Sequence, residues 1–146
     1  MNNIVEYHRD NYTTSTDPDR LDIGVIYNFL STGSYWAQNR PLDVVRRSIE
    51  NSLNFGVYCD SRQVGFARII TDYATFAWLC DVFILHEQRN CGLGKWLVEC
   101  VVNHPELKPL RRILLATRDA HELYRQYGGF TPLANPDRWM EKTNIR

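Results

Sequence analysis

The chain has 146 residues, of which 44% are hydrophobic, enough to form a core as one self-sufficient domain over residues 1–146. Its 17 basic residues balance its 17 acidic residues, which argues against nucleic acid or an anionic membrane as the main partner. No apolar stretch reaches the roughly 20 residues that cross a bilayer, and Met1 to Asp10 is polar, unlike a secretion signal, so we expect a cytoplasmic protein.

The cysteines and histidines show no ligand spacing. Cys80 and Cys100 lie within apolar segments, where a thiol usually packs as a small hydrophobic group. The four histidines are also far from one another in the chain. We predict free thiols and no metal site.

Two helices are expected in the N-terminal third. Asp17 can cap a helix whose first turn accepts Pro18 and which Gly33 ends, with apolar residues at helical spacing: Leu21, Val25, Phe29 and Leu30. Pro41 opens a second helix with one apolar face: Leu42, Val45 and Ile49. The loop between them carries two large aromatic residues, Tyr35 and Trp36.

The hydrophobic period then changes from about 3.6 to 2, which indicates strands. Phe55 to Cys59, Gln63 to Thr71 and Thr75 to Leu85 form an expected antiparallel meander, with a tight turn at Asp60-Ser61. The third of these strands is apolar on both faces and is therefore predicted to be central.

The remaining elements alternate between helix and strand. A helical stripe from Leu93 to Val101 ends at His104-Pro105, and Arg112 to Ala116 is predicted as a short buried strand. Ala120 to Tyr127 forms another helical face that ends at Gly128-Gly129, and Trp139 to Lys142 is a candidate last strand. The order predicts an α/β (α+β) fold with a mixed central sheet.

The segment from Gln88 to Lys95 lies between the central strand and the helix that follows it. Gly92 and Gly94 let the backbone approach a ligand closely, and the first turn of the helix presents unpaired N–H groups. The helix dipole adds about 0.3–1 kcal/mol for an anionic group at this end. We predict that this loop binds the pyrophosphate of a nucleotide-type cofactor.

The segment lacks the third glycine of the dinucleotide fingerprint and the Gly-Lys-Ser/Thr of the P-loop. The alternative interpretation of the bare motif is a glycine-rich turn that only caps a helix.

The pattern Arg-x-x-Gly-x-Gly, starting at Arg89, resembles the acyl-CoA-binding loop of the GCN5-related N-acetyltransferases, the GNAT family. A second segment, Ala120-His121-Glu122-Leu123-Tyr124 through Gly128-Gly129-Phe130, is similar to the family's Ala-x-x-Leu-Tyr-x-x-x-Gly-Phe segment. The resemblance implies a GNAT-like, mostly antiparallel sheet flanked by about four helices. The chain departs from the family in an extra glycine at Gly128-Gly129, in His86 at a frequent proline position and in Thr117 at a frequent asparagine position.

The resemblance implies that acetyl-CoA is bound mainly by the protein backbone. Its pyrophosphate would bind the amides of the glycine loop, next to Arg89, and its pantetheine arm would pair with the central strand like an added strand. Thr117 stands where many members contact the cofactor with an asparagine. The residues implied in the loop are Asn90, Cys91, Gly92, Leu93, Gly94 and Lys95, and those in the strand are Val82, Phe83 and Ile84.

In this family an amine attacks the thioester directly, without a covalent enzyme intermediate. Tyr124 is the candidate acid for the leaving thiolate, because a phenol with a pKa of about 10 can protonate it. The alternative is that Tyr124, on the apolar face of its helix, is an ordinary core residue. Asp81 is the candidate base, acting through water, because a buried carboxylate can have a raised pKa. The alternative for Asp81 is a structural acceptor of hydrogen bonds.

Acceptor recognition is expected in the loop between the first two helices and in a neighbouring turn, at Tyr35, Trp36, Arg40 and Asp72. The alternative is that the loop aromatics pack over the sheet or at a dimer contact. The leading hypothesis is an N-acetyltransferase for a primary amine of a small molecule. A protein or peptide N-acetyltransferase and a non-catalytic, acyl-CoA-binding regulatory domain are the alternatives, and an exposed edge strand near the C-terminus would permit a homodimer.

Overall fold

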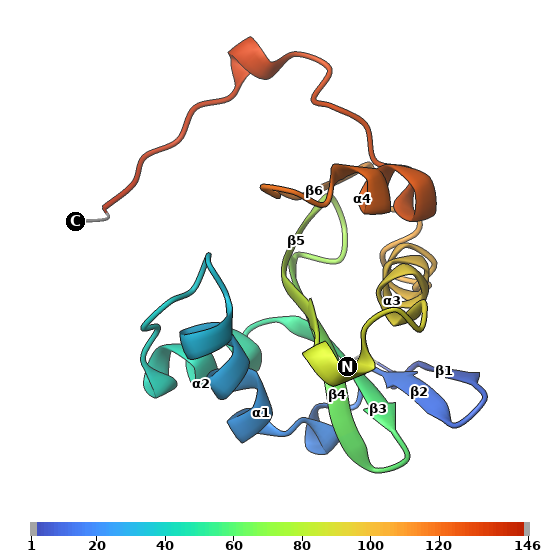
Figure 1. The fold of residues 1–146 in the computed structure, drawn as a ribbon. Helices are drawn as coiled ribbons and strands as arrows, with labels where there is room; N and C mark the ends of the chain where they lie inside the picture. Colours follow the sequence, from blue (N-terminus) through green and yellow to red (C-terminus); the bar gives the residue numbers. More distant parts are fainter. Residues whose placement is uncertain (1–2, 145–146) are drawn as a thin grey trace.

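A six-stranded sheet in the order β1-β2-β3-β4-β5-β6 lies at the centre of the structure, a computed structural model that describes residues 3–144 (Figure 1). Neighbouring strands are antiparallel from β1 to β5, whereas β5 and β6 run parallel. The expected mixed, mostly antiparallel sheet is therefore confirmed. Its strands are β1 (Glu6–Arg9), β2 (Tyr12–Ser15), β3 (Leu53–Cys59), β4 (Arg62–Thr71), β5 (Phe76–Ile84) and β6 (Arg112–Leu114).

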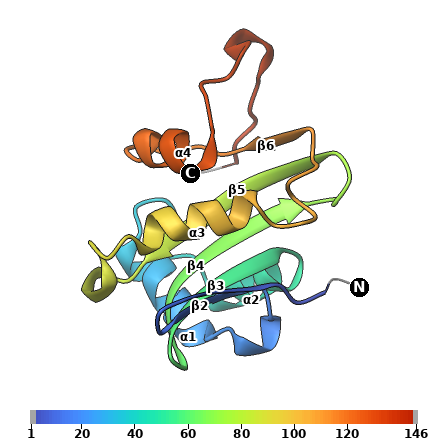
Figure 2. The ribbon, with the colours of Figure 1, turned by 90° about the vertical axis from the view of Figure 1, so that its right-hand side faces the viewer.

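Helices cover both faces of this sheet (Figures 1 and 2). One face carries α1 (Ile23–Asn28) and α2 (Leu42–Glu50), and the other carries α3 (Leu93–Val102) and α4 (His121–Gly128). No helix within residues 3–144 has both the length and the apolar character that a bilayer crossing demands.

Each face of the sheet has its own buried apolar cluster. On the α1–α2 face, Ile26 and Val45 pack with Phe66 and Phe83, whose rings lie near one another. On the other face, α3 buries Leu93, Leu97, Val98 and Val101 against the strands. Burial of one such aliphatic side chain stabilises the fold by about 1.5–3 kcal/mol. The apolar periodicity of the sequence thus identified the core face of α3 correctly.

The first helix begins later than the sequence suggested. Asp17 and Pro18 start a short 3-10 turn, in which the Asp17 side chain accepts a hydrogen bond from the Asp19 amide. The α-helix begins after Asp22, whose carboxylate accepts a hydrogen bond from the Val25 amide at 3.1 Å. Two aspartates can each cap a turn, and the second one starts α1.

The two ends of the chain also differ from expectation. Residues 6–15 form the hairpin β1–β2, which the polar N-terminal sequence did not indicate. β6 ends at Leu114 rather than Ala116 and is only half-buried, because it lies at the edge of the sheet. The predicted strand from Trp139 to Lys142 is absent. In its place, residues 131–144 leave the body of the structure with exposed side chains (Figures 1 and 2).

A β-bulge interrupts the pairing of β5 with β4 in the second half of β5. Ala67 of β4 lies opposite two residues, Asp81 and Val82, and Asp81 has a positive φ of 52°. Such a bulge bends a strand and redirects its side chains. β6 pairs with β5 only along Phe76 to Trp78, so within residues 3–144 the edge of β5 from Leu79 to Ile84 has no strand beside it.

Candidate functional site

The glycine loop connects the open end of β5 to α3, as the sequence predicted. Gly92 is the N-cap of α3 with φ of 78°, a backbone conformation that favours glycine, and no side chain caps this helix. The first amides of α3 are therefore available to an anion, as at other helix N-termini.

The two glycines of the loop have different roles. A Cβ atom on Gly92 would be strained by the positive φ and would lie 3.1 Å from Nη2 of Arg9. A Cβ atom on Gly94 would meet no protein atom closer than Cγ1 of Ile84, at 3.9 Å. Gly92 is thus required by the fold of the loop, whereas Gly94 leaves space that a ligand can fill.

The N-terminal hairpin supports this loop, a contact that sequence reasoning missed. Nη2 of Arg9 donates a hydrogen bond to the Cys91 carbonyl at 3.1 Å, and the Tyr12 hydroxyl donates one to Oε1 of Gln88 at 2.9 Å. Arg89 turns inward along the loop, since its Nε donates to the Ile84 carbonyl at 3.1 Å. The two contacts from the hairpin join residues 82 and 76 positions apart, so no local sequence pattern predicts them.

A cleft of about 610 Å³ lies between this loop, the open edge of β5 and α4. All expected cofactor-binding residues line it except Cys91, whose side chain is exposed, and Thr117. Oγ1 of Thr117 instead accepts a hydrogen bond from the amide of Ala120 at 3.1 Å, in the turn that precedes α4. Besides the expected residues, the lining contains Gln88, Ala120, Leu123 and Tyr124.

The unpaired edge of β5 in this cleft can accept an extended ligand. Val82, Phe83 and Ile84 all line the cleft and lie beyond the last residue of β5 that pairs with β6. Main-chain N–H and C=O groups on such an edge bind extended molecules in the way that a strand binds another strand. The cleft therefore fits a ligand with a diphosphate at one end and an amide-containing arm along β5.

A second cavity of about 380 Å³ adjoins the cleft. It brings Tyr35, Trp36 and Arg40 of the N-terminal loop, the residues expected to contact the acceptor, together with Asp81. Val82, Ala120 and Tyr124 line both the cleft and this cavity. A group held in the cleft and a group held in the cavity would thus meet beside Tyr124.

The carboxylate of Asp81 is buried in this cavity and is fully engaged. Oδ2 accepts hydrogen bonds from Nη1 of Arg40 at 2.8 Å and from Nε of Arg68 at 2.9 Å, and Oδ1 accepts one from Nε1 of Trp36 at 2.8 Å. Burial alone would raise the pKa of Asp81, but the charges of Arg68 and Arg40 and their hydrogen bonds outweigh it and hold this pKa below its usual value. The expectation of a raised pKa was wrong, because the sequence did not reveal the two arginines as partners.

Asp72 lies outside the cavity, contrary to the expectation that it contacts the acceptor. It shapes the turn between β4 and β5. Its Oδ1 accepts hydrogen bonds from the amides of Ala74, Thr75 and Phe76, and its Oδ2 accepts one from the Thr75 hydroxyl. Hydrogen bonds from Thr75, first from its hydroxyl, lower the pKa of Asp72.

Tyr124 is almost fully buried at the junction of the cleft and the cavity, with 8% of its surface exposed. Its ring packs edge-on against Phe130, 5.9 Å away between ring centroids. Burial raises the pKa of the Tyr124 phenol to about 12, so the hydroxyl is protonated throughout the neutral range. Tyr124 therefore belongs both to the core and to the site.

Sequence reasoning missed several residues of the cavity, among them the charged or aromatic residues Arg68, Trp78 and Asp119. Arg68 offered a signal, because it interrupts an apolar strand between Ala67 and Ile69, and a buried arginine needs a partner of opposite charge. Among residues 3–144, no group of three or more His, Cys, Asp or Glu side chains is placed to hold a metal ion.

Comparison with known proteins identifies relatives of the chain. Residues 50–131 match the family model of the acetyltransferase (GNAT) domain. A protein of Gibberella zeae that is described as an acetyltransferase is 32% identical over 136 residues, which cover 80% of this chain and 77% of that protein. A crystal structure of a GNAT-family protein from Xanthomonas campestris pv. campestris is 50% identical, with a TM-score of 0.88, and the match covers 93% of this chain and 95% of that chain.

A more distant structure shows the same fold with a ligand. An acetyltransferase from Clostridium acetobutylicum, crystallised with acetyl-CoA, has 15% sequence identity and a TM-score of 0.65. The match covers 91% of this chain and 95% of that chain.

We expect Asp81→Asn to lower the free energy of unfolding at neutral pH by about 3–5 kcal/mol, because it leaves two buried guanidinium groups without a counter-charge. The lowered pKa of Asp81 stabilises the fold above the ordinary aspartate pKa, and this stabilisation is lost as pH falls through the folded-state pKa. The difference between wild type and variant should therefore shrink below about pH 4. Urea unfolding across this pH range measures it.

Glu122→Gln is the matched control for this carboxylate, because the Glu122–Arg125 pair is exposed and should contribute little. Equal stability of Asp81→Asn and wild type at neutral pH would show that the Asp81 cluster does not support the fold.

Proposed function

The chain belongs to the GNAT family of acetyltransferases, and from this premise we propose that it transfers the acetyl group of acetyl-CoA to a primary amine of a small molecule. It is an acyltransferase, and acetyl-CoA is its cofactor. The observation that supports the finer proposal is the junction of the two cavities at Val82, Ala120 and Tyr124. The modest volume of the second cavity, about 380 Å³, favours a small acceptor over a peptide.

We propose that the whole chain acts as one domain in which the backbone holds acetyl-CoA. The amides of the loop before α3 and of its first turn, from Asn90 to Lys95, would bind the pyrophosphate. Main-chain groups of Val82, Phe83 and Ile84 would bind the pantetheine arm, and one of these N–H groups would polarise the thioester carbonyl.

The proposed chemistry is direct attack in a ternary complex. Acetyl-CoA supplies an activated acetyl thioester, whose carbon forms a bond to the amine nitrogen while the carbon–sulfur bond breaks. Tyr124, protonated at neutral pH, would donate a hydrogen bond and then a proton to the departing sulfur. Burial raises the pKa of the Cys80 thiol in the same cavity to about 11, so Cys80 is not an activated nucleophile for an acetyl-enzyme.

The geometry favours a positioning role for Asp81 over the role of a base. Its two oxygens are engaged by Trp36, Arg40 and Arg68, and its lowered pKa makes it a weak base. A carboxylate in this state fixes the surrounding side chains. The exposed carboxylate of Asp119 lines the same cavity, and a proton from the acceptor ammonium could leave past it to water.

The two alternatives make different use of the same site. A protein or peptide N-acetyltransferase would need an open groove for an extended chain, and the acceptor cavity is bordered by Trp36 and Tyr124. A regulatory domain that only binds acyl-CoA would not need a hydroxyl group at the junction.

The four free thiols support a reducing compartment, and we propose a cytoplasmic location.

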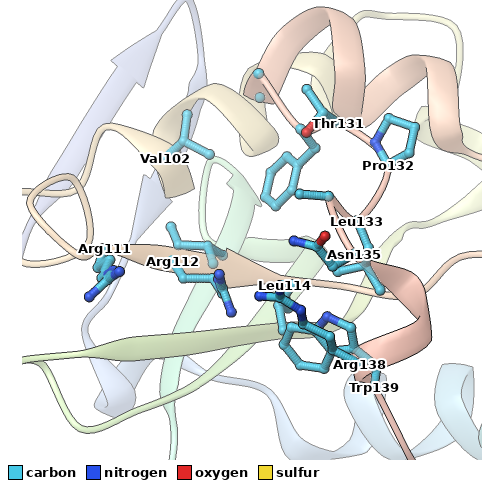
Figure 3. A pocket seen from close by; sticks show the side chains of 15 residues that line it. Val102, Arg111, Arg112, Leu114, Thr131, Pro132, Leu133, Asn135, Arg138 and Trp139 are labelled. Carbon is cyan, nitrogen blue, oxygen red and sulfur yellow. The ribbon is translucent and has the colours of Figure 1, made fainter.

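We also propose that two copies of the chain associate through the open edge of β6. A groove of about 620 Å³ separates β6 from the C-terminal segment, with Val102 and Leu114 in its lining (Figure 3). Arg111, Arg112 and Arg138 surround it. The C-terminal segment of the same chain carries the exposed side chain of Met140 and the partly exposed side chains of Leu133 and Trp139, of which Trp139 lies against the Arg112 guanidinium. In a two-fold symmetric dimer, the C-terminal segment of each copy would bind the open edge of β6 in the other copy.

For the cofactor, we expect Gly94→Ala to weaken coenzyme A binding at least about tenfold without loss of thermal stability, because the added Cβ fills ligand space but touches no protein atom closely. Calorimetric titration measures the affinity. Gly65→Ala is the contrasting variant, since its Cβ would lie 2.7 Å from Cδ1 of Ile84 and should reduce stability by about 1–3 kcal/mol. Unchanged affinity in Gly94→Ala would exclude the proposed pyrophosphate site.

For catalysis, we expect amine-dependent release of coenzyme A from acetyl-CoA in a screen of amines, amino acids and peptides, with an N-acetyl product seen by mass spectrometry. Tyr124→Phe should lower kcat about 100-fold and leave KM for acetyl-CoA nearly unchanged, because it removes only the proton donor. Tyr127→Phe, on the same helix but outside both cavities, is the control. Full activity of Tyr124→Phe would remove the acid role, and no transfer to any amine would contradict the function.

For the dimer, analytical ultracentrifugation should show a dimer that Met140→Asp weakens at least about tenfold. The Met140 side chain is 96% exposed in a single chain, so the change should not affect the fold. Thr143→Asp adds the same charge nearby as a control. A wild-type monomer at all concentrations would refute the association.

A further inference from the structure

The acceptor cavity contains two guanidinium groups around one carboxylate. Arg40 and Arg68 both line the cavity, and both donate to the same oxygen, Oδ2 of Asp81. Their side chains are largely withdrawn from water, with 21% and 11% exposed. The Trp36 indole that donates to the other oxygen is neutral. This buried cluster of three ionised groups therefore carries a net positive charge.

The two arginines retain donors that the cluster does not use. A guanidinium group has five N–H donors in a planar fork. Arg40 donates to Asp81 through Nη1, and Arg68 donates through Nε to Asp81 and through Nη1 to Ser52. Nη2 of each arginine takes part in none of these bonds. A charge held away from water is costly unless an anion pairs with it, and the arginine fork fits a carboxylate best.

A carboxylate of the protein lies on a different wall of the cavity. Asp119 precedes α4 and stands next to Ala120, one of the residues at the junction with the cofactor cleft. This exposed carboxylate lies 3.9 Å from Nη2 of Arg118, and it would still attract an ammonium group to the place where acetyl transfer is proposed. The arginines come from the N-terminal loop and β4, so the cavity offers positive and negative charge on separate elements.

We propose that the acceptor is a small amine that also carries a carboxylate, an amino-acid-type molecule whose carboxylate binds Arg40 and Arg68. This inference rests on the proposed acetyl transfer and adds the chemical class of the acceptor. Trp36 and Trp78 line the same cavity and would pack against the apolar part of such a molecule. Asp81 fixes the two guanidinium groups and acts on the acceptor only through them.

The first test uses the wild-type protein and matched acceptors. kcat/KM is measured with acetyl-CoA for alanine, β-alanine, 4-aminobutanoate and phenylalanine, each beside its primary carboxamide, and for 2-phenylethylamine. For at least one amino acid, kcat/KM should be at least about tenfold higher than for its amide, because the amide cannot form the charge-assisted hydrogen bonds that the carboxylate forms with the arginines. The amines of the α-amino amides are less basic, so a larger fraction of them is unprotonated and reactive at neutral pH. This difference favours the amides, so a preference for the amino acids cannot be caused by it.

The possible outcomes distinguish the acceptor class from the proposed function. If transfer occurs but kcat/KM for the amides or 2-phenylethylamine equals that for every amino acid, the acceptor class is wrong and the acetyltransferase function is retained. If no amine accepts the acetyl group, both the function and the acceptor class are wrong.

A variant then tests the residues. Arg40→Gln should raise KM for the preferred amino acid and bring the ratio of its kcat/KM to that of the amide to about one. Arg46→Gln, an exposed arginine on α2, should leave the preference intact. Circular dichroism checks the fold, and Arg40→Lys, which keeps the charge without the planar fork, replaces Arg40→Gln if that variant unfolds. Equal losses for acid and amide would overturn the assignment.

Discussion

The carboxylate of Asp81 joins three separate parts of the chain at the β-bulge of β5. It accepts hydrogen bonds from the N-terminal loop through Trp36 and Arg40, and from β4 through Arg68. The residue itself has a positive φ in a β-bulge, a conformation that costs free energy and that the surrounding contacts must stabilise. One buried group therefore fixes Trp36, Arg40 and Arg68 in the wall of the acceptor cavity, beside the open edge of β5.

The cofactor site depends on the backbone rather than on particular side chains. The cleft is formed by an uncapped helix start, a glycine without close neighbours and a strand edge without a partner. Support comes from Arg9 and Tyr12 on the N-terminal hairpin, which bind the loop from outside the cleft. Such a site fits a long, flexible cofactor at one end, while charged and aromatic side chains in the adjoining cavity distinguish acceptors.

The sequence predicted the elements whose signals are local. The helical stripe of α3, the meander β3–β5 and the glycine loop before α3 all follow from periodicity and from glycine chemistry. Long-range features could not be predicted, because they depend on contacts with residues that are distant in the sequence. The lowered pKa of Asp81 depends on arginines 13 and 41 positions away, and the hairpin β1–β2 is placed by pairing with β3. Asp72 was assigned to the site because a turn aspartate that binds its own backbone looks the same in sequence as one that binds a ligand.

Hydrogen exchange of backbone amides with and without coenzyme A tests the central claim most directly, because main-chain binding of the cofactor is what the site requires. We predict slower exchange at Val82 to Ile84 and at Gly92 to Lys95 when coenzyme A is added, with little change along β3. Binding of coenzyme A that leaves these amides unprotected, or that protects a different surface, would contradict the account.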